Sequence, residues 1–115
     1  MKRKHLFFSL LLASSALSAQ DWPVAQPEAR PATRWWWLGS AVDAPNLTYN
    51  MEEYAKAGLG GVEITPIYGV QGNDKNNLPF LSPEWMQMLQ HIQAEGKRIG
   101  LEIDMNTGTG WPFGG

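Results

Sequence analysis

Acidic and amide side chains follow one another in the last strand-like stretch of this 115-residue chain. Residues 101–106 read Leu-Glu-Ile-Asp-Met-Asn, and this alternation predicts a strand with Glu102, Asp104 and Asn106 on one face. A glycine-rich loop follows at 107–115 and contains one indole, Trp111. Carboxylates and amides bind hydroxyl groups, an indole offers a flat apolar face, and glycines let a ligand approach the backbone closely. We therefore expect Asp104, Asn106 and Trp111 to line a sugar-binding pocket.

Two earlier strand-like stretches add Trp37 and Glu63 to this pocket. Residues 60–66 (Gly-Gly-Val-Glu-Ile-Thr-Pro) predict a strand with Glu63 on its polar face, ending at Pro66 because proline cannot donate a hydrogen bond to a neighbouring strand. Residues 33–39 (Thr-Arg-Trp-Trp-Trp-Leu-Gly) predict a buried strand whose three indoles point to alternate faces. These indoles could pack in the core or stack on a pyranose ring. Our hypothesis places Trp37 in the sugar subsite.

The same carboxylates are candidates for catalysis. General acid/base chemistry needs two carboxylates at one pocket, and Glu63, Glu102 and Asp104 have the parity that allows it. We favour hydroxyl binding for these groups and keep Glu63 and Asp104 as secondary catalytic candidates. The residue pattern indicates no metal-ligand set. His91 has no partner four residues away, so we interpret it as a solvated or capping residue.

Two helices are expected between the strands. Residues 43–46 are turn-forming and lead into a helix with one apolar side and an outer Glu52–Lys56 pair. The second helix begins at Ser82, an N-cap followed by proline, and ends at Gly100 after two basic residues. Each helix therefore has an apolar stripe that must pack against the strands.

The resulting order, strand, helix, strand, helix, strand, predicts an α/β fold with parallel strands and right-handed crossovers. Strands covered by helices on both faces should be apolar throughout, yet Glu63, Glu102, Asp104 and Asn106 keep one face polar. A barrel with acids near the carboxyl ends of its strands explains this face, whereas a single-layer antiparallel sheet does not explain the helices. We expect residues 33–115 to form about three strands and two helices of a (β/α)8 barrel, after an extended lead-in at 20–32.

Residues 1–19 predict a signal peptide, and hence a periplasmic or extracellular protein. Three basic residues at 2–4 precede an apolar run at 6–12 and small residues at 14–19. This run is much shorter than the roughly 20 residues of a membrane-spanning helix. Removing residues 1–19 leaves six basic and eleven acidic side chains, a net charge of −5, which argues against a nucleic-acid partner. Without cysteine, the exported chain would depend on its core instead of disulfides.

Four sequence blocks recur in the order and spacing of a known family. They are Arg30-Pro31 with Arg34-Trp35-Trp36-Trp37, Ala-Gly-Leu-Gly-Gly-Val-Glu-Ile at 57–64, Phe-Leu-Ser-Pro-Glu-Trp at 80–85, and Gly-Leu-Glu-Ile-Asp-Met-Asn at 100–106 with Thr-Gly-Trp at 109–111. Together they resemble the start of glycoside hydrolase family 106, whose characterised members are α-L-rhamnosidases acting on plant polysaccharides. One departure is Leu-Gly-Ser at 38–40, where many relatives carry a Met-Asn-Gly-like segment. This departure bears on the sugar specificity.

The resemblance implies a (β/α)8 catalytic barrel followed by β-sandwich domains, and inverting hydrolysis assisted by calcium. Inversion uses a carboxylic acid to protonate the leaving oxygen and a carboxylate to activate water, about 6.5–9.5 Å apart. In the family these glutamates lie on later strands. We therefore expect the catalytic pair and the calcium ligands beyond Gly115, and an N-terminal fragment that is itself inactive. The alternative is a secreted, non-catalytic, tryptophan-rich carbohydrate-binding protein, or an inactive remnant of the enzyme.

Overall fold

The computed structural model describes residues 23–112. Its elements in chain order are η1 (Pro27–Ala29), β1 (Ala32–Leu38), α2 (Ala44–Lys56), β2 (Gly61–Ile67), η2 (Asp74–Asn76), α3 (Pro83–Ile99) and β3 (Glu102–Met105). The signal peptide that the sequence predicts, and residues 20–22 of the lead-in, lie outside the described residues. In the described part of the lead-in, the 3-10 turn η1 interrupts a backbone that the sequence predicts to be extended.

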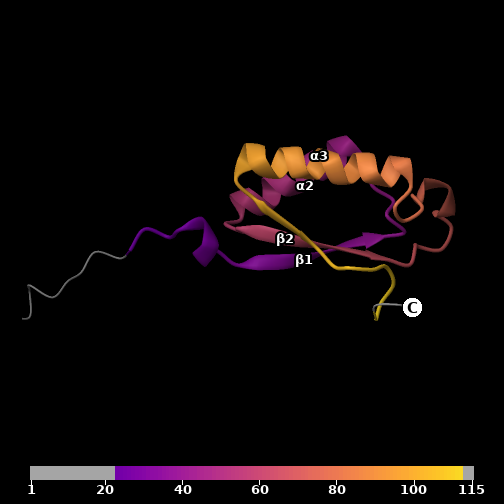
Figure 1. The fold of residues 1–115 in the computed structure, drawn as a ribbon, viewed down its shortest axis with the longest axis horizontal. Coiled ribbons are helices and arrows are strands. Elements are labelled where there is room, and N and C mark those ends of the chain that lie inside the picture. The colour runs from indigo at the N-terminus through magenta and orange to yellow at the C-terminus, as the bar shows by residue number, and fades with distance from the viewer. Residues whose placement is uncertain (1–22, 113–115) are drawn as a thin grey trace, which may run out of the picture.

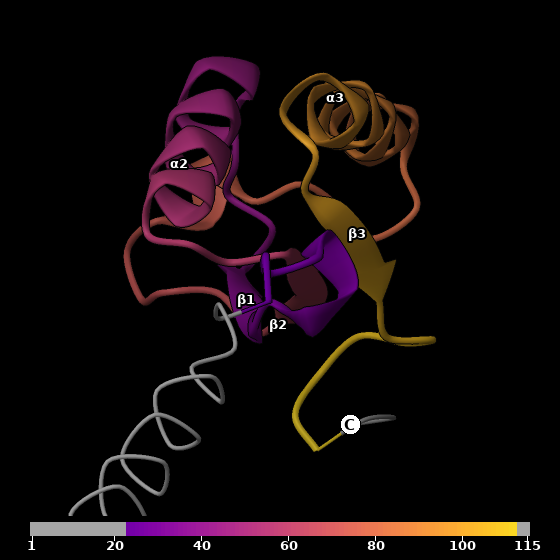
Figure 2. The same cartoon turned by 90° about the vertical axis from the view of Figure 1, so that its left-hand side faces the viewer.

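The three strands form one parallel sheet in the order β1-β2-β3. Helix α2 connects β1 to β2, helix α3 connects β2 to β3, and both helices cover the same face of the sheet (Figures 1 and 2). The other side is the open face, and no helix within residues 23–112 covers it (Figure 2). Arg34, Glu63 and Asp104 are register partners on this face, because the residues that alternate with them in β1 and β2 are buried under the helices. The predicted alternation and parallel pairing are confirmed, as an α/β layer of three strands and two helices.

The helices begin and end where local chemistry directs them. The Asp43 side chain accepts the Asn46 backbone N–H at 3.0 Å, and this hydrogen bond lowers the pKa of Asp43. Ser82 caps α3 by accepting the Trp85 N–H at 3.2 Å. Gly100 ends α3 with φ of 72°, in the left-handed region that glycine enters at little cost. The predicted N-cap and C-cap of α3 are confirmed.

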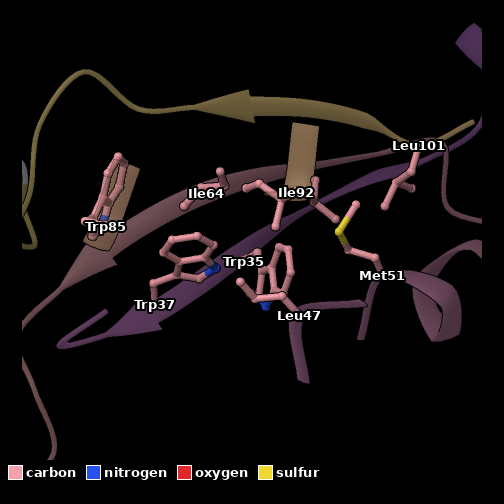
Figure 3. Close-up of a cluster of buried hydrophobic side chains, with 9 residues drawn as sticks. Trp35, Trp37, Leu47, Met51, Ile64, Trp85, Ile92 and Leu101 are labelled. Atoms are coloured by element: carbon pink, nitrogen blue, oxygen red, sulfur yellow. The ribbon is translucent and has the colours of Figure 1, made fainter. Parts of the chain in front are cut away.

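The core lies between the sheet and the two helices (Figure 3). Its fully or nearly buried side chains are Trp35, Trp37, Leu47, Met51, Val62, Ile64, Trp85, Ile92 and Leu101. Trp35 and Trp37 of β1 meet edge to face, with ring centroids 5.8 Å apart. The Trp85 indole donates to the Ser40 hydroxyl at 2.9 Å, so this buried N–H is satisfied. Burial of these aromatic and aliphatic groups holds the strands in register.

Strand β2 continues past the predicted end at Pro66, to Ile67. Successive residues of a strand direct their backbone groups to opposite neighbouring strands. The Ile67 carbonyl accepts from Gly39 N, next to β1. The Pro66 carbonyl accepts from Gly110 N, in the segment that follows β3. Pro66 therefore lacks its N–H on the side where β3 has already ended, at Met105. The expectation that Pro66 ends the strand was wrong because the missing donor removes no bond between the described strands.

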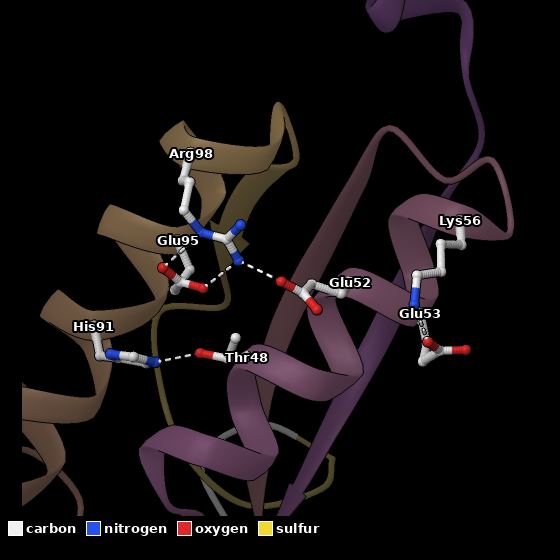
Figure 4. A network of polar contacts seen from close by, with 7 residues as sticks. All are labelled: Thr48, Glu52, Glu53, Lys56, His91, Glu95 and Arg98. Atoms are coloured by element: carbon white, nitrogen blue, oxygen red, sulfur yellow. Dashed lines mark hydrogen bonds and ion pairs between the residues drawn. The ribbon is translucent and has the colours of Figure 1, made fainter.

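An ion-pair network joins α2 to α3 on the outer surface (Figure 4). Arg98 Nη2 lies 2.6 Å from Glu52 Oε1 and 2.7 Å from Glu95 Oε2. The hydrogen bond from Arg98 holds the pKa of Glu95 below its ordinary value. The predicted Glu52–Lys56 pair is wrong, because Glu52 faces Arg98 on the other helix. Lys56 instead contacts Glu53 at 2.6 Å, and this hydrogen bond raises the pKa of Lys56.

His91 also joins the two helices. Its Nε2 lies 2.8 Å from Thr48 Oγ1, with donor and acceptor roles set by the histidine tautomer (Figure 4). Together with the Arg98–Glu52 ion pair, this contact joins α2 to α3. The placement gives His91 a role in helix packing.

Candidate functional site

Three ionisable side chains form a row across the open face. Arg34 pairs in register with Glu63, and Glu63 pairs with Asp104. Register partners in a parallel sheet point to the same face, so one residue from each strand contributes to the row. Arg34 Nε donates to Glu63 Oε2 at 2.9 Å. Arg34, Glu63 and Asp104 border a shallow groove of about 450 Å³.

Two indoles lie beside this row. The Trp36 and Trp111 rings meet edge to face with centroids 5.1 Å apart. The guanidinium carbon of Arg34 lies 4.8 Å from the Trp111 ring and 5.5 Å from the Trp36 ring, within the range of cation–π attraction. Both indoles are partly exposed, at 41% and 44%, and with Leu38, Ile67 and Tyr68 they line a second hollow of about 340 Å³. The open face therefore places an apolar wall next to polar groups.

The segment after β3 carries Trp111 back across the sheet to β1. Asn106 N donates to Ile64 O at 3.2 Å, which continues the β2–β3 pairing. Gly110 N then donates to Pro66 O at 3.0 Å, and Thr109 Oγ1 donates to the same oxygen at 3.3 Å. These bonds fix the loop over the carboxyl end of β2, and Trp111 reaches the β1 side chains from there. The contact depends on this loop path.

The structure brings together three of the five residues expected to line the subsite: Glu63, Asp104 and Trp111. Trp37 requires a correction. It is 1% exposed and packs against Trp85 under the helices, so it offers no surface to a sugar. The alternation of the indoles is as predicted, but the helices cover the face of Trp35 and Trp37. The open face therefore receives Trp36 instead.

Asn106 lies at the end of the polar face but does not open onto it. Its side chain is 8% exposed, and neither its oxygen nor its nitrogen has a hydrogen-bond partner among the described residues. A buried amide without a hydrogen-bond partner costs free energy, so the Asn106 side chain retains unused hydrogen-bonding capacity.

Sequence reasoning missed Arg34 and Trp36. Arg34 precedes three indoles and belongs to no recognised binding motif. Its place in the site follows from its ion pair with Glu63 on the next strand. A signal was available, because Arg34 and Trp36 have the same parity in β1. Linking that parity to Glu63 requires the strand register.

The calcium ligands that the family resemblance implies are expected beyond Gly115, and the described residues do not offer a ligand set of their own. Within residues 23–112 no group of three or more acidic, histidine or cysteine side chains is placed to hold a metal ion. Calcium in proteins takes six to eight oxygen ligands. The open face offers the carboxylates of Glu63 and Asp104, and Glu63 is already paired with Arg34.

None of the helices within residues 23–112 has the length and apolar character needed to cross a membrane.

A one-sided helix layer with an open face of acids, a guanidinium and exposed indoles defines an α/β protein equipped to bind a polar ring with an apolar side. The sequence pattern of a family described as alpha-L-rhamnosidase, glycoside hydrolase family 106, matches residues 24–115. The chain belongs to this family, and the resemblance carried by the four sequence blocks is confirmed.

Two relatives of the chain are much longer than the chain itself. Over 89 residues it is 26% identical to a protein of Formosa agariphila named "Putative beta-glucuronidase", a match that covers 76% of this chain and 7% of that protein. The solved structure of a rhamnosidase from Novosphingobium sp. PP1Y matches with a TM-score of 0.64 and 22% identity, over 76% of this chain and 8% of that one. The likeness to this structure supports the α/β fold. The chain spans less than a tenth of either relative.

Proposed function

We propose that the whole protein is an exported glycoside hydrolase of α-L-rhamnosidase type that acts on plant-type polysaccharide. In this proposal the open face of β1, β2 and β3 forms one wall of its sugar subsite. The observation that carries the proposal is the row of Arg34, Glu63 and Asp104 beside the Trp36–Trp111 pair. Family membership over residues 24–115 supports the reaction class.

The charge of the row favours a neutral sugar. One guanidinium faces two carboxylates, so the row carries a net charge of −1 and would repel the carboxylate of a uronic acid. Asp104 can accept a hydrogen bond from one sugar hydroxyl. The Glu63 carboxylate accepts from Arg34 through Oε2, and its other oxygen can accept a hydrogen bond from a neighbouring hydroxyl. This arrangement suits a vicinal diol, which rhamnosides and glucuronides both carry, and the net charge of the row favours the rhamnoside.

The aromatic hollow supplies the complementary apolar contact. Trp36 and Trp111 stand at right angles, so one ring can present its face while the other presents its edge. Leu38 and Ile67 extend this apolar surface. A 6-deoxy sugar has hydroxyl groups along one part of its ring and a methyl group at another. It therefore matches a groove bordered by acids on one side and indoles on the other.

The proposed (β/α)8 barrel accounts for the open face. Strands in sequential parallel order with helices on one side are the repeating unit of such a barrel, whose inner face is the one without helices. The active sites of these barrels lie at the carboxyl ends of the strands, where Trp111 and Tyr68 lie here. The open outer edges of β1 and β3 leave positions for further strands of the whole protein.

For catalysis we propose single-step hydrolysis with inversion, in which Glu63 and Asp104 bind substrate and other residues of the whole protein supply the acid and base. Neighbouring parallel strands lie about 4.8 Å apart. An inverting pair needs about 6.5–9.5 Å between carboxyl groups, to leave room for a water molecule. Glu63 and Asp104 project from adjacent strands, and Glu63 is already paired with Arg34 at 2.9 Å, so we assign both carboxylates to substrate binding. Their contribution is to orient the sugar for attack by water on a carbon that other groups activate.

The test is hydrolysis by the whole protein of aryl α-L-rhamnoside and aryl β-D-glucuronide, with the product anomer followed by NMR. The proposal predicts release of β-L-rhamnose first, and glucuronide turnover at least about 100-fold slower, because the row would have to desolvate a like charge. Rhamnose binding without hydrolysis would instead favour a non-catalytic carbohydrate-binding role. Preferred turnover of the glucuronide would contradict the charge argument.

A further inference from the structure

Arg34 contacts side chains from three separate segments on the open face. Its Nε donates to Glu63 on β2, and its guanidinium approaches both Trp36 on β1 and Trp111 after β3. One side chain thus links a carboxylate and two indoles that come from three separate segments. The side chains of Arg34 and Glu63 are each about one third exposed (36% and 34%), so the link lies at the surface of the groove.

The exposure of this ion pair indicates that its main effect is on geometry. An ion pair at the protein surface contributes little to folding stability, because water and salt screen the two charges. The loop that carries Trp111 is held to Pro66 by two hydrogen bonds, which fix its backbone but not the angle of the indole. The Arg34 guanidinium and the Trp36 ring both contact the Trp111 ring and constrain this angle.

We propose that Arg34 is a positioning residue of the sugar subsite, which orients the Trp111 indole and the Glu63 carboxylate toward the groove. This inference rests on the proposed function, since it concerns the same subsite. Arg34 acts through its neighbours: the guanidinium plane holds the indole by cation–π attraction while its edge holds the carboxylate.

Lysine cannot reproduce this role. An ammonium group keeps the charge and can pair with Glu63, but it is a compact, flexible point charge without a plane. An Arg34→Lys substitution therefore preserves the net charge of the row while releasing the ring of Trp111. The substitution separates orientation from electrostatics, which removal of the charge would not do.

The experiment compares the whole protein with its Arg34→Lys, Trp111→Phe and doubly substituted variants, on aryl α-L-rhamnoside. Arg34→Lys should raise KM roughly fivefold, as expected for one lost cation–π contact, with kcat within twofold. The double variant should be no worse than Trp111→Phe alone, because the two residues act as a unit. Arg98→Lys, which alters an arginine ion pair on the outer helical surface, is the matched control and should leave KM unchanged.

A second readout does not require activity. In protein labelled with 5-fluorotryptophan, the ¹⁹F resonance of Trp111 is identified by its loss in Trp111→Phe. Arg34→Lys should shift or broaden this resonance, and Arg98→Lys should not. An unchanged resonance, or fully additive effects on KM, would overturn the role of Arg34. Absence of both rhamnoside turnover and sugar binding in the unsubstituted protein would overturn the proposed function instead, and the ¹⁹F comparison would still decide the positioning.

Discussion

The Trp111 indole lies 4.8 Å from the guanidinium carbon of Arg34, although one residue follows the last described strand and the other lies on the first. The loop after β3 crosses β2 to make this contact, since β2 separates β1 from β3. Because of this contact, the Trp36–Trp111 pair lies on one side of the open face and the charged row of Arg34, Glu63 and Asp104 lies on the other. The sugar-binding proposal depends on this relationship.

Asp104 is expected to bind a sugar hydroxyl in the whole protein. A hydrogen bond to a charged group contributes about 1.5–3 kcal/mol, so Asp104→Ala should lower kcat/KM roughly 10- to 100-fold. Glu102→Ala is the matched control, because Glu102 has the same parity on β3 but pairs with Gly61, one step nearer the amino end of the strands. Steady-state kinetics of the two variants checks this. Equal losses in both would remove Asp104 from the subsite.

Trp37 and Trp111 should respond in opposite ways to alanine. Trp37 is fully buried, so Trp37→Ala should lower the free energy of unfolding by about 3–5 kcal/mol. Trp111 is 44% exposed, so Trp111→Ala should cost far less stability and mainly weaken sugar binding. Denaturant unfolding and rhamnose titration of both variants distinguish the roles. A stable Trp37→Ala protein that has lost rhamnose binding would show that the correction to Trp37 was mistaken.

Gly96 lies where α3 packs tightly against Leu101 and Ile103. A Cβ at this position would lie 2.7 Å from the backbone oxygen of Leu101 and 2.8 Å from Ile103 Cγ1. Gly96→Ala should therefore destabilise the protein by about 1–3 kcal/mol through overpacking, despite the helix propensity of alanine. Thermal unfolding should show a lower Tm for Gly96→Ala than for Gln90→Ala, an exposed control on the same helix. A Tm equal to or above that of the unsubstituted protein would mean that α3 can move away from β3.

The Glu95–Arg98 pair should make the free energy of unfolding decrease at low pH. Because Arg98 lowers the pKa of Glu95 in the folded state, the pair stabilises the fold above the ordinary glutamate pKa of about 4.3. The contribution should fall as pH drops below that value and through the lowered pKa of Glu95. Denaturant unfolding between pH 7 and pH 3 should show a smaller acid loss for Glu95→Gln than for the unsubstituted protein. Identical acid profiles would exclude this pair as a source of the loss.

Local signals in the sequence predict much of the fold. Ser82 followed by proline predicts the start of α3, and Gly100 predicts its end; both act through backbone groups within a few residues. Alternation predicts β3 and the opposed faces of the three indoles. These signals succeed because caps and strand parity are properties of short segments.

The remaining features depend on neighbours that a short segment does not reveal. Parity separates Trp36 from Trp37 but does not say which side the helices cover, and this choice misplaced Trp37. Glu52 pairs with Arg98 on another helix, an outcome set by how α2 packs on α3. Arg34 gains its role from the β1–β2 register and from the path of the loop after β3. Long-range packing decides each of these cases.

The most direct test is a crystal structure of the whole protein with L-rhamnose bound. We predict a sugar ring against the Trp111 indole, with a hydroxyl within hydrogen-bond distance of an Asp104 carboxylate oxygen, on the open face of β1, β2 and β3. A sugar bound elsewhere, with Asp104 and Trp111 covered by other parts of the protein, would contradict the proposed subsite.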